Sequence, residues 1–125
     1  MDSEVRNFYD LRVWQDAHQL SLAIYAITKH FPKEEQFGLV SQMRRASSSI
    51  TANIAEGFGR FHYNDKVRFY HQARGSAVEL QDHLFLSRDL KYISEDDARA
   101  MLARADLVMK ELNGLINSTK RQQMA

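Results

Sequence analysis

The stretch that decides the fold is QMRRASSSITANIAEGFGR, which spans residues 42–60. Its apolar side chains recur every three or four residues, a spacing that places them on one face of a helix. They are Met43, Ala46, Ile50, Ile54 and Phe58. Glycine readily adopts the left-handed conformation that ends many helices. We therefore predict a helix that begins near Glu34 or Phe37, ends at Glu56 and has Gly57 as its left-handed cap.

Small side chains occupy several faces of this helix at once. Serine and threonine are mediocre helix formers, yet with alanine they fill residues 46–49, 51, 52 and 55. Gly75 and Ser76 interrupt the next helical pattern, where glycine costs about 1 kcal/mol relative to alanine. We expect the two small patches to meet in a close helix crossing. Because small and polar surfaces recur on helices that already have a core stripe, we also expect a homo-oligomer.

Three further segments carry the helical period. They are residues 11–31, 65–90 and 95–117. Pro32 ends the first, because proline disfavours helical geometry in the residue before it. Asn64 and Ser94 are good N-caps for the other two. In the second helix, the core stripe extends back to Phe37 and Val40.

Four long helices with short connections and no strand pattern predict an all-α fold, an antiparallel up-down-up-down four-helix bundle. The 125 residues suit a single domain over residues 1–125. Within it, we expect residues 1–10 and 118–125 to be loosely ordered ends. The charged N-terminal segment does not resemble a signal peptide, and no apolar run is long enough to span a membrane. With no cysteine in the chain, we expect a cytoplasmic protein without disulfides.

Net charge is only +1, but it is unevenly distributed. Residues 42–74 hold six Lys and Arg against two Asp and Glu, whereas the segments before and after are slightly acidic. An uneven field attracts polyanions even when total charge is near zero. The alternative is a solvated helix face with scattered arginines. Our candidates for binding a nucleic acid or a partner are Arg44, Arg45, Arg60, Lys66, Arg68 and Arg74.

Motifs of catalysis and metal binding are not found in the sequence. It has no Glu-x-x-His of the di-iron bundles, no Gly-x-Ser-x-Gly elbow and no Walker loop. Glu79 and His83 share one helix face, but the other histidines lack partnering acids at metal-ligand spacing. We therefore predict no catalytic residue, no metal, no cofactor and no small-molecule substrate, and a protein that is not an enzyme.

Polar side chains on the two middle helices are candidates for linking helices or contacting another subunit. They are Gln42, Asn53, Glu56 and Glu79. Glu79 is flanked by apolar residues next to the predicted crossing, so a charge there needs a partner. An ion pair of Glu79 with Arg45 or Arg44 would link the helices. The alternative is contact with a ligand or a nucleic acid.

Aromatic residues alternate with basic ones after residue 57. They are Phe58, Phe61, Tyr63, Phe69 and Tyr70. Such mixtures stack nucleic-acid bases and neutralise phosphates. Tyrosine and arginine also favour protein interfaces, and for the aromatic residues we favour that interpretation.

The order of these motifs resembles a four-helix-bundle family, the 23S rRNA intervening-sequence proteins. The resemblance covers residues 11–90. Its motifs are Val13-Trp14-Gln15, Phe31-Pro32, Phe37-Gly38-Leu39, Gln42 with Arg44-Arg45, Ser49-Ile50 with Asn53-Ile54-Ala55-Glu56-Gly57, Gly59-Arg60, and Gly75-Ser76 with Glu79-Leu80.

The resemblance implies a small cytosolic bacterial protein that assembles into a ring, a homopentamer. The family is named for a genomic location inside ribosomal RNA insertions, which is not an activity. A related family, the accessory variability proteins of diversity-generating retroelements, forms basic pentameric barrels that partner a reverse transcriptase and nucleic acid. This makes an RNA or an RNA-associated protein our first hypothesis for the partner. The alternative is a structural or scaffold homo-oligomer that binds a protein.

Overall fold

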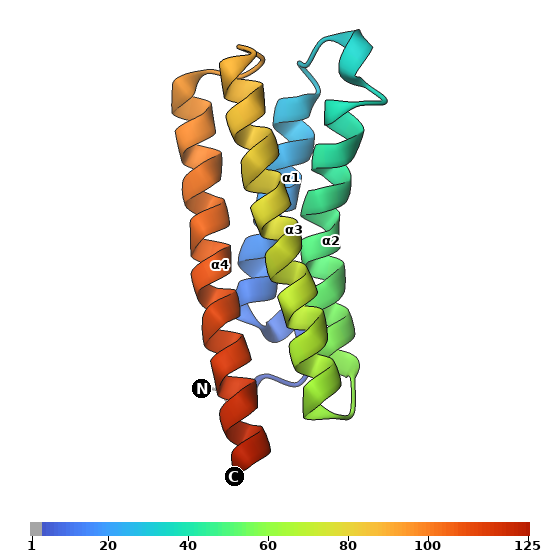
Figure 1. Ribbon diagram of the computed structural model, residues 1–125, viewed down its shortest axis with the longest axis vertical. Coiled ribbons are helices and arrows are strands. Elements are labelled where there is room, and N and C mark those ends of the chain that lie inside the picture. The colour runs from blue at the N-terminus through green and yellow to red at the C-terminus, as the bar shows by residue number, and fades with distance from the viewer. Residues whose placement is uncertain (1–3) are drawn as a thin grey trace.

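The computed structural model describes residues 4–125, which form four long helices and no strand. The helices are α1 (Arg12–Thr28), α2 (Leu39–Gly59), α3 (Tyr63–Asp89) and α4 (Glu95–Met124). Two short 3₁₀ turns, η2 (Phe8–Asp10) and η3 (Lys33–Glu35), precede α1 and α2. Figure 1 shows the four helices side by side with alternating direction. The predicted all-α antiparallel four-helix bundle is therefore confirmed.

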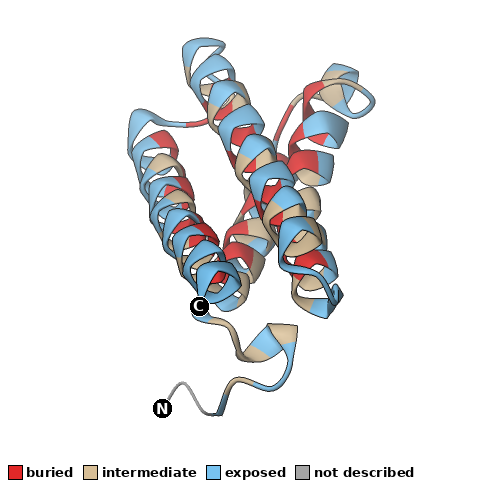
Figure 2. Cartoon of the chain, turned by 60° about the horizontal axis from the view of Figure 1, so that its bottom comes forward, coloured by how far each residue is buried: buried red, intermediate tan, exposed pale blue. Residues whose placement is uncertain are grey.

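The core is built from one apolar stripe on each helix. Figure 2 shows the buried residues on the inward faces and the exposed ones outside. Fully buried side chains include Leu20, Ile24, Met43, Ile50, Ile54, Leu80, Leu84, Val108 and Leu112. Each such side chain contributes about 1.5–3 kcal/mol when it leaves water. The predicted stripes therefore account for the bundle, except at Phe37, which was placed in the core and is 91% exposed.

The start of α2 lies later than predicted, and this explains the error at Phe37. Gly38 precedes the helix, and Glu35 Oε1 accepts the backbone N–H of Leu39 at 3.2 Å. Phe37 lies in the loop between η3 and α2, outside the helical repeat. The Phe37 side chain is therefore exposed to solvent, and the first buried residues of α2 are Leu39 and Val40.

The predicted role of Gly57 is wrong. No glycine among residues 4–125 has a positive φ angle, and α2 continues through Gly57 to Gly59. A Cβ atom at Gly57 would lie 2.7 Å from Cε1 and 2.9 Å from Cδ1 of Tyr70. Glycine is needed here so that the ring of Tyr70, from α3, can pack against the backbone of α2.

Serine side chains, and not Gly75, lie where the small patches of α2 and α3 meet. The hydroxyls of Ser49 and Ser76 lie 2.9 Å apart, so the two small patches do meet. Gly75, however, is exposed, and a Cβ atom there would find nothing within 4 Å. The prediction that Gly75 makes room for the crossing is therefore wrong.

Further helix ends differ from the predicted ones. Helix α1 ends at Thr28 and not at Phe31. The N-cap of α3 is His62 and not Asn64, and its side chain makes no capping bond. Ser94 caps α4 as predicted, since its hydroxyl accepts the N–H of Asp97 at 3.0 Å. Beyond residue 118, where we expected a loosely ordered end, α4 continues to Met124 and buries Thr119. Of the N-terminal residues, 1–3 lie outside the described part of the chain, and 8–10 form η2.

Candidate nucleic-acid interface

Two arginines flank one aromatic ring where α2 turns into α3. The guanidinium carbon of Arg60 lies 4.6 Å from the centroid of the Phe69 ring, and that of Arg68 lies 4.9 Å from it. The turn is short because α2 ends at Gly59 and α3 begins at Tyr63. This brings Arg60, at the end of one helix, onto the first turns of the next.

Exposed aromatic side chains lie in the same turn. Phe61 is 90% exposed and Tyr63 is 40% exposed. The ring of Phe61 meets only the edge of His62, at a centroid distance of 5.1 Å. We call Arg60, Phe61, Tyr63, Arg68 and Phe69 the cation–aromatic turn. It offers two guanidinium groups and an aromatic face to solvent at one end of the bundle.

Each arginine of this turn also has a carboxylate neighbour. Arg60 Nη2 lies 3.0 Å from Glu56 Oε2, and Arg68 Nη2 lies 3.6 Å from Asp65 Oδ1. All four side chains are about half exposed. Such surface pairs contribute only about 0–1 kcal/mol. A polyanion can therefore compete for both guanidinium groups at little cost.

Lys66, a candidate for binding a nucleic acid or a partner, forms hydrogen bonds with backbone carbonyls at the end of α2. Its Nζ donates to the carbonyl of Phe58 at 2.6 Å and to that of Gly57 at 3.4 Å. It also lies 5.3 Å from the centroid of the Phe58 ring. A cation is favourable beside the free carbonyls of a helix C-terminus. Burial lowers the pKa of Lys66, because a charged group loses solvation there.

Arg44 and Arg74 link pairs of helices away from the turn. Arg44 Nε donates to Thr28 Oγ1 at 2.9 Å, and its guanidinium carbon lies 4.8 Å from the centroid of the Tyr25 ring in α1. Arg74 Nε donates to Asn113 Oδ1 of α4 at 2.9 Å. The six basic residues therefore do not form one continuous surface. The structure brings only Arg60 and Arg68 around a common centre.

The predicted ion pair between α2 and α3 is present. Arg45 Nη2 lies 3.9 Å from Glu79 Oε2, and the same carboxylate oxygen lies 3.3 Å from His83 Nε2. The Arg45 side chain is 72% exposed and that of Glu79 is 44% exposed, so the pair is more solvated than the partly buried pair that the sequence predicts. Of the two partners considered for Glu79, the structure selects Arg45.

The other polar candidates divide between the crossing and the surface. Asn53 Nδ2 donates to the carbonyl and to the hydroxyl of Ser49, at 2.9 and 3.1 Å, and Ser49 meets Ser76. Glu56 is engaged with Arg60. Gln42 is exposed, with no side-chain hydrogen bond to any other described residue. Asn53 thus acts within the α2–α3 crossing, whereas Gln42 is free to meet a partner.

A carboxyl that sequence analysis missed lies between α1 and α4. Glu111 Oε2 is 4.0 Å from Arg12 Nε, and its Oε1 is buried without a hydrogen-bond partner among residues 4–125. Burial raises the pKa of Glu111 to about 7, and the neighbouring carboxyl group of Asp16 adds to this. No motif marks Glu111, because its environment comes from a helix almost a hundred residues away in the chain.

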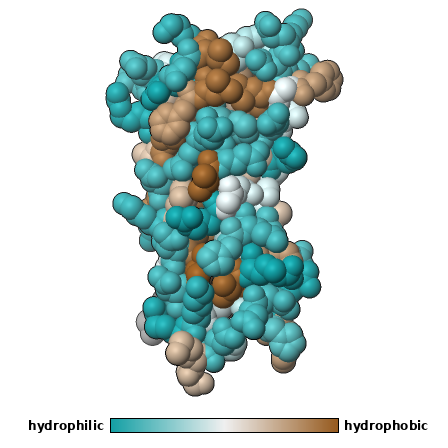
Figure 3. All heavy atoms as spheres, in the orientation of Figure 1, coloured by the Kyte–Doolittle hydropathy of each residue, from teal (hydrophilic) through white to brown (hydrophobic). Residues whose placement is uncertain are grey.

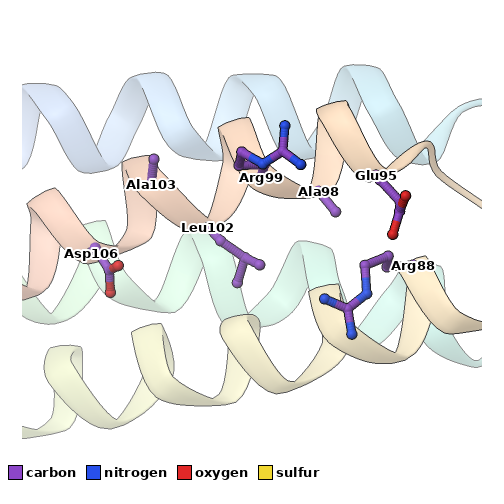
Figure 4. A pocket seen from close by; sticks show the side chains of 7 residues that line it. All are labelled: Arg88, Glu95, Ala98, Arg99, Leu102, Ala103 and Asp106. Carbon is purple, nitrogen blue, oxygen red and sulfur yellow. The ribbon is translucent and has the colours of Figure 1, made fainter.

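A shallow groove between α3 and α4 is the other polar hollow that the sequence did not indicate. It encloses about 310 Å³ and is lined by Arg88, Glu95, Ala98, Arg99, Leu102, Ala103 and Asp106 (Figure 4). Three of its four charged side chains have partners. Arg88 Nε donates to Asp89 Oδ1 at 2.9 Å and Arg99 Nη1 to Asp96 Oδ1 at 3.1 Å, while Asp106 Oδ1 accepts Gln81 Nε2 at 2.9 Å.

Residues 4–125 contain no cluster of three or more His, Cys, Asp or Glu side chains that could hold a metal ion. Within the same residues, no helix is long and apolar enough to cross a membrane.

Comparison with known proteins finds a matching family model and a solved structure with a similar fold. A family model described as 23S rRNA-intervening sequence protein matches residues 9–114. No curated protein matched the sequence. The chain is similar to the crystal structure of a protein with unknown function from the S23 ribosomal protein family of Bacteroides thetaiotaomicron VPI-5482, with a TM-score of 0.75 and 21% identity over 83% of this chain and 97% of that one. At this identity the likeness supports the four-helix fold alone.

Proposed function

Because the chain belongs to the 23S rRNA-intervening sequence protein family, we propose that it is a non-enzymatic, ring-forming bundle that binds RNA or an RNA-associated particle in the cytoplasm. One observation carries the proposal: Arg60 and Arg68 flank Phe69 beside the exposed Phe61. These two arginines share the partly exposed ring of Phe69 and have only weak surface partners.

The chemistry of the cation–aromatic turn suits single-stranded RNA. Guanidinium groups neutralise phosphates and release counterions, which supplies most of the affinity of non-specific binding. An exposed ring such as Phe61 offers a face on which a base stacks, worth about 1–3 kcal/mol per base. Three other candidates, Arg44, Lys66 and Arg74, are held by hydrogen bonds to neighbouring helices, so we assign them to folding and not to RNA contact.

A titration of labelled single-stranded and hairpin RNA oligonucleotides at two salt concentrations tests this function. The wild type is expected to bind with a steep salt dependence, and the Arg60→Ala/Arg68→Ala variant to lose a slope of about 0.7 for each phosphate contact removed. Arg99→Ala is the matched control. It removes an exposed Arg three residues from an Asp, as in the pair of Arg68, but in α4 at the opposite end. Absence of binding to either RNA at low salt contradicts the proposal.

A second candidate function, a scaffold homo-oligomer that binds a protein, is favoured by the outer face of α3. Gly75 has open space around it, and Val78, Phe85 and Leu86 are each exposed by close to half. Their spacing places them along one side of the helix. Figure 3 shows hydrophobic atoms interrupting the hydrophilic surface on the side that carries α3 and gathering near the α3–α4 end. Exposed apolar stripes of this kind mark interfaces.

Light scattering at micromolar concentration tests the assembly. We expect the mass of a ring, a pentamer as the family resemblance implies. A monomeric mass excludes both the ring and the scaffold. If Arg60→Ala/Arg68→Ala leaves both the mass and the binding of the partner unchanged, the scaffold function is favoured over RNA binding.

A further inference from the structure

A cavity of about 440 Å³ lies at the end of the bundle where α2 ends and α3 begins. It draws its lining from the segment before α1, from α2, from the start of α3 and from the last turns of α4. The lining residues are Val5, Leu11, Phe58, Lys66, Tyr70, Leu115, Ser118, Thr119 and Gln122. This volume is within the range of small-molecule sites. Neither the family nor the proposed RNA contact assigns a role to it.

One side of the cavity is apolar and built from three segments, the one before α1, α2 and α4. Val5, Leu11, Phe58 and Leu115 supply hydrocarbon and an aromatic ring. Leu11 and Leu115 also pack against the main core, so this wall is continuous with the rigid interior of the bundle. A ligand body placed here would be held by preformed packing.

The cavity has one cationic side chain, Lys66, and none of its lining residues is acidic. Lys66 Nζ gives two hydrogen bonds to the carbonyls of Phe58 and Gly57, and an ammonium has three donors, so one remains. Tyr70 is 2% exposed and lines the cavity, so its hydroxyl can donate to a bound group there. Lys66 and Tyr70 are one helical turn apart on α3, so they present their donors from the same side.

Gly57 is what allows Tyr70 to occupy this position. Since a Cβ atom at Gly57 would collide with the Tyr70 ring, the glycine is required for the ring to pack against α2. The Lys66 ammonium is held by the backbone carbonyls of Phe58 and Gly57. The end of α2 therefore positions both groups.

We propose that this cavity binds a small amphipathic carboxylate, with the carboxylate between the Lys66 ammonium and the Tyr70 hydroxyl and the apolar body against Leu11, Phe58 and Leu115. One cation and one hydroxyl match a single negative charge, whereas a phosphate dianion would require more donors. Burial raises the pKa of Tyr70 to about 12, so its hydroxyl keeps the proton that it donates. A bound carboxylate raises the lowered pKa of Lys66, because the opposite charge favours the ammonium form.

Methyl NMR of the full-length chain, titrated with octanoate, tests the proposal. We expect saturable shifts at Leu11, Leu115 and Thr119 and none at Leu102, which lines the separate α3–α4 groove. Tyr70→Phe keeps the ring and removes only the hydroxyl, so the variant folds and binds octanoate about tenfold more weakly. Lys66→Met keeps the stem and removes the charge, with at least the same loss. Arg99→Met, in the other groove, leaves octanoate binding unchanged.

Two outcomes overturn the proposal. One is that the uncharged 1-octanol shifts the same methyl groups with the affinity of octanoate, which would make the cavity a purely apolar hollow. The other is that octanoate at millimolar concentration leaves Leu11, Leu115 and Thr119 unshifted, or binds the Tyr70→Phe and Lys66→Met variants as tightly as the wild type. Neither outcome depends on RNA, because the cation–aromatic turn contributes no lining residue.

Discussion

At Gly57 the packing of α3 against α2 leaves no space for a side chain. We predict that Gly57→Ala destabilises the protein, because overpacking costs about 1–3 kcal/mol and the better helix propensity of alanine offsets only about 1 kcal/mol of it. The matched control is Gly114→Ala in α4, where a Cβ atom meets nothing within 4 Å. That substitution should stabilise by up to about 1 kcal/mol. Urea unfolding of both variants provides the measurement, and equal stabilisation by the two would show that Tyr70 does not constrain residue 57.

Glu111 makes the stability of the fold depend on pH. Its pKa is about 7 in the folded protein, above the value of about 4.3 in an unfolded chain. Between these two values the folded state binds more protons than the unfolded state, so the free energy of unfolding falls as pH rises and then levels off. We predict that Glu111→Gln removes this decline between about pH 4.3 and pH 7.

Thermal unfolding across that pH range checks the prediction for Glu111. The control is Glu95→Gln, which removes an exposed carboxyl from the same helix. It should leave the pH profile as in the wild type. A Glu111→Gln variant that keeps the decline would place its cause in another group.

At the scale of the helix, Ser94 is the residue that marks where α4 begins. The Ser94 hydroxyl satisfies the N–H of Asp97, one of the donors that a helix leaves unpaired in its first turn. We predict that Ser94→Ala costs about 1 kcal/mol of stability. Ser48→Ala in the middle of α2 is the control, because its hydroxyl only bonds back to the carbonyl of Arg45, and its loss should be neutral or slightly stabilising. Comparable losses in the two variants, measured by chemical denaturation, would argue against the cap.

The helices were predictable because their signals are local. Residues close by in the chain are enough to recognise the apolar stripe of Met43, Ile50 and Ile54 and the helix cap at Ser94. The errors arose where a distant element decides. Gly57 is consistent with a left-handed cap when only its neighbours in the chain are considered, but the Tyr70 ring from α3 is what requires a glycine there. Phe37 fits the apolar repeat of α2, but the hydrogen bond from the Leu39 N–H to Glu35 places the start of that helix at Leu39.

The same distinction applies to the candidate site. Helical periodicity narrows the partner of Glu79 to Arg44 or Arg45, and only the structure shows that it is Arg45. For Lys66 the sequence gives no partner, because the carbonyl of Phe58 that accepts its hydrogen bond lies at the end of another helix. A count of basic residues in the sequence therefore does not reveal the contacts that the fold gives each cation.

At the scale of the whole molecule, the proposed RNA contact and the proposed assembly occupy different places. The cation–aromatic turn is at one end of the bundle, whereas Phe85 lies in the last part of α3, towards the other (Figure 1). In a ring, several copies of the turn would engage one RNA, and linked sites bind more tightly than single ones by about 10²–10⁴-fold. Assembly would thus amplify a contact that is weak in one chain.

Because the proposed RNA contact and the proposed assembly surface are separate, substitutions in the two places should have different effects. Phe85→Glu places a charge on the exposed apolar stripe of α3, so we expect a helical monomer by light scattering and circular dichroism, with RNA affinity lowered at least tenfold although Arg60 and Arg68 are intact. Arg60→Ala/Arg68→Ala should retain the mass of the ring and lose RNA binding. Asp82→Ala removes a charge next to the stripe and should leave both properties unchanged. If Phe85→Glu becomes monomeric yet binds RNA as tightly as the wild type, a single turn suffices and avidity has no part in recognition.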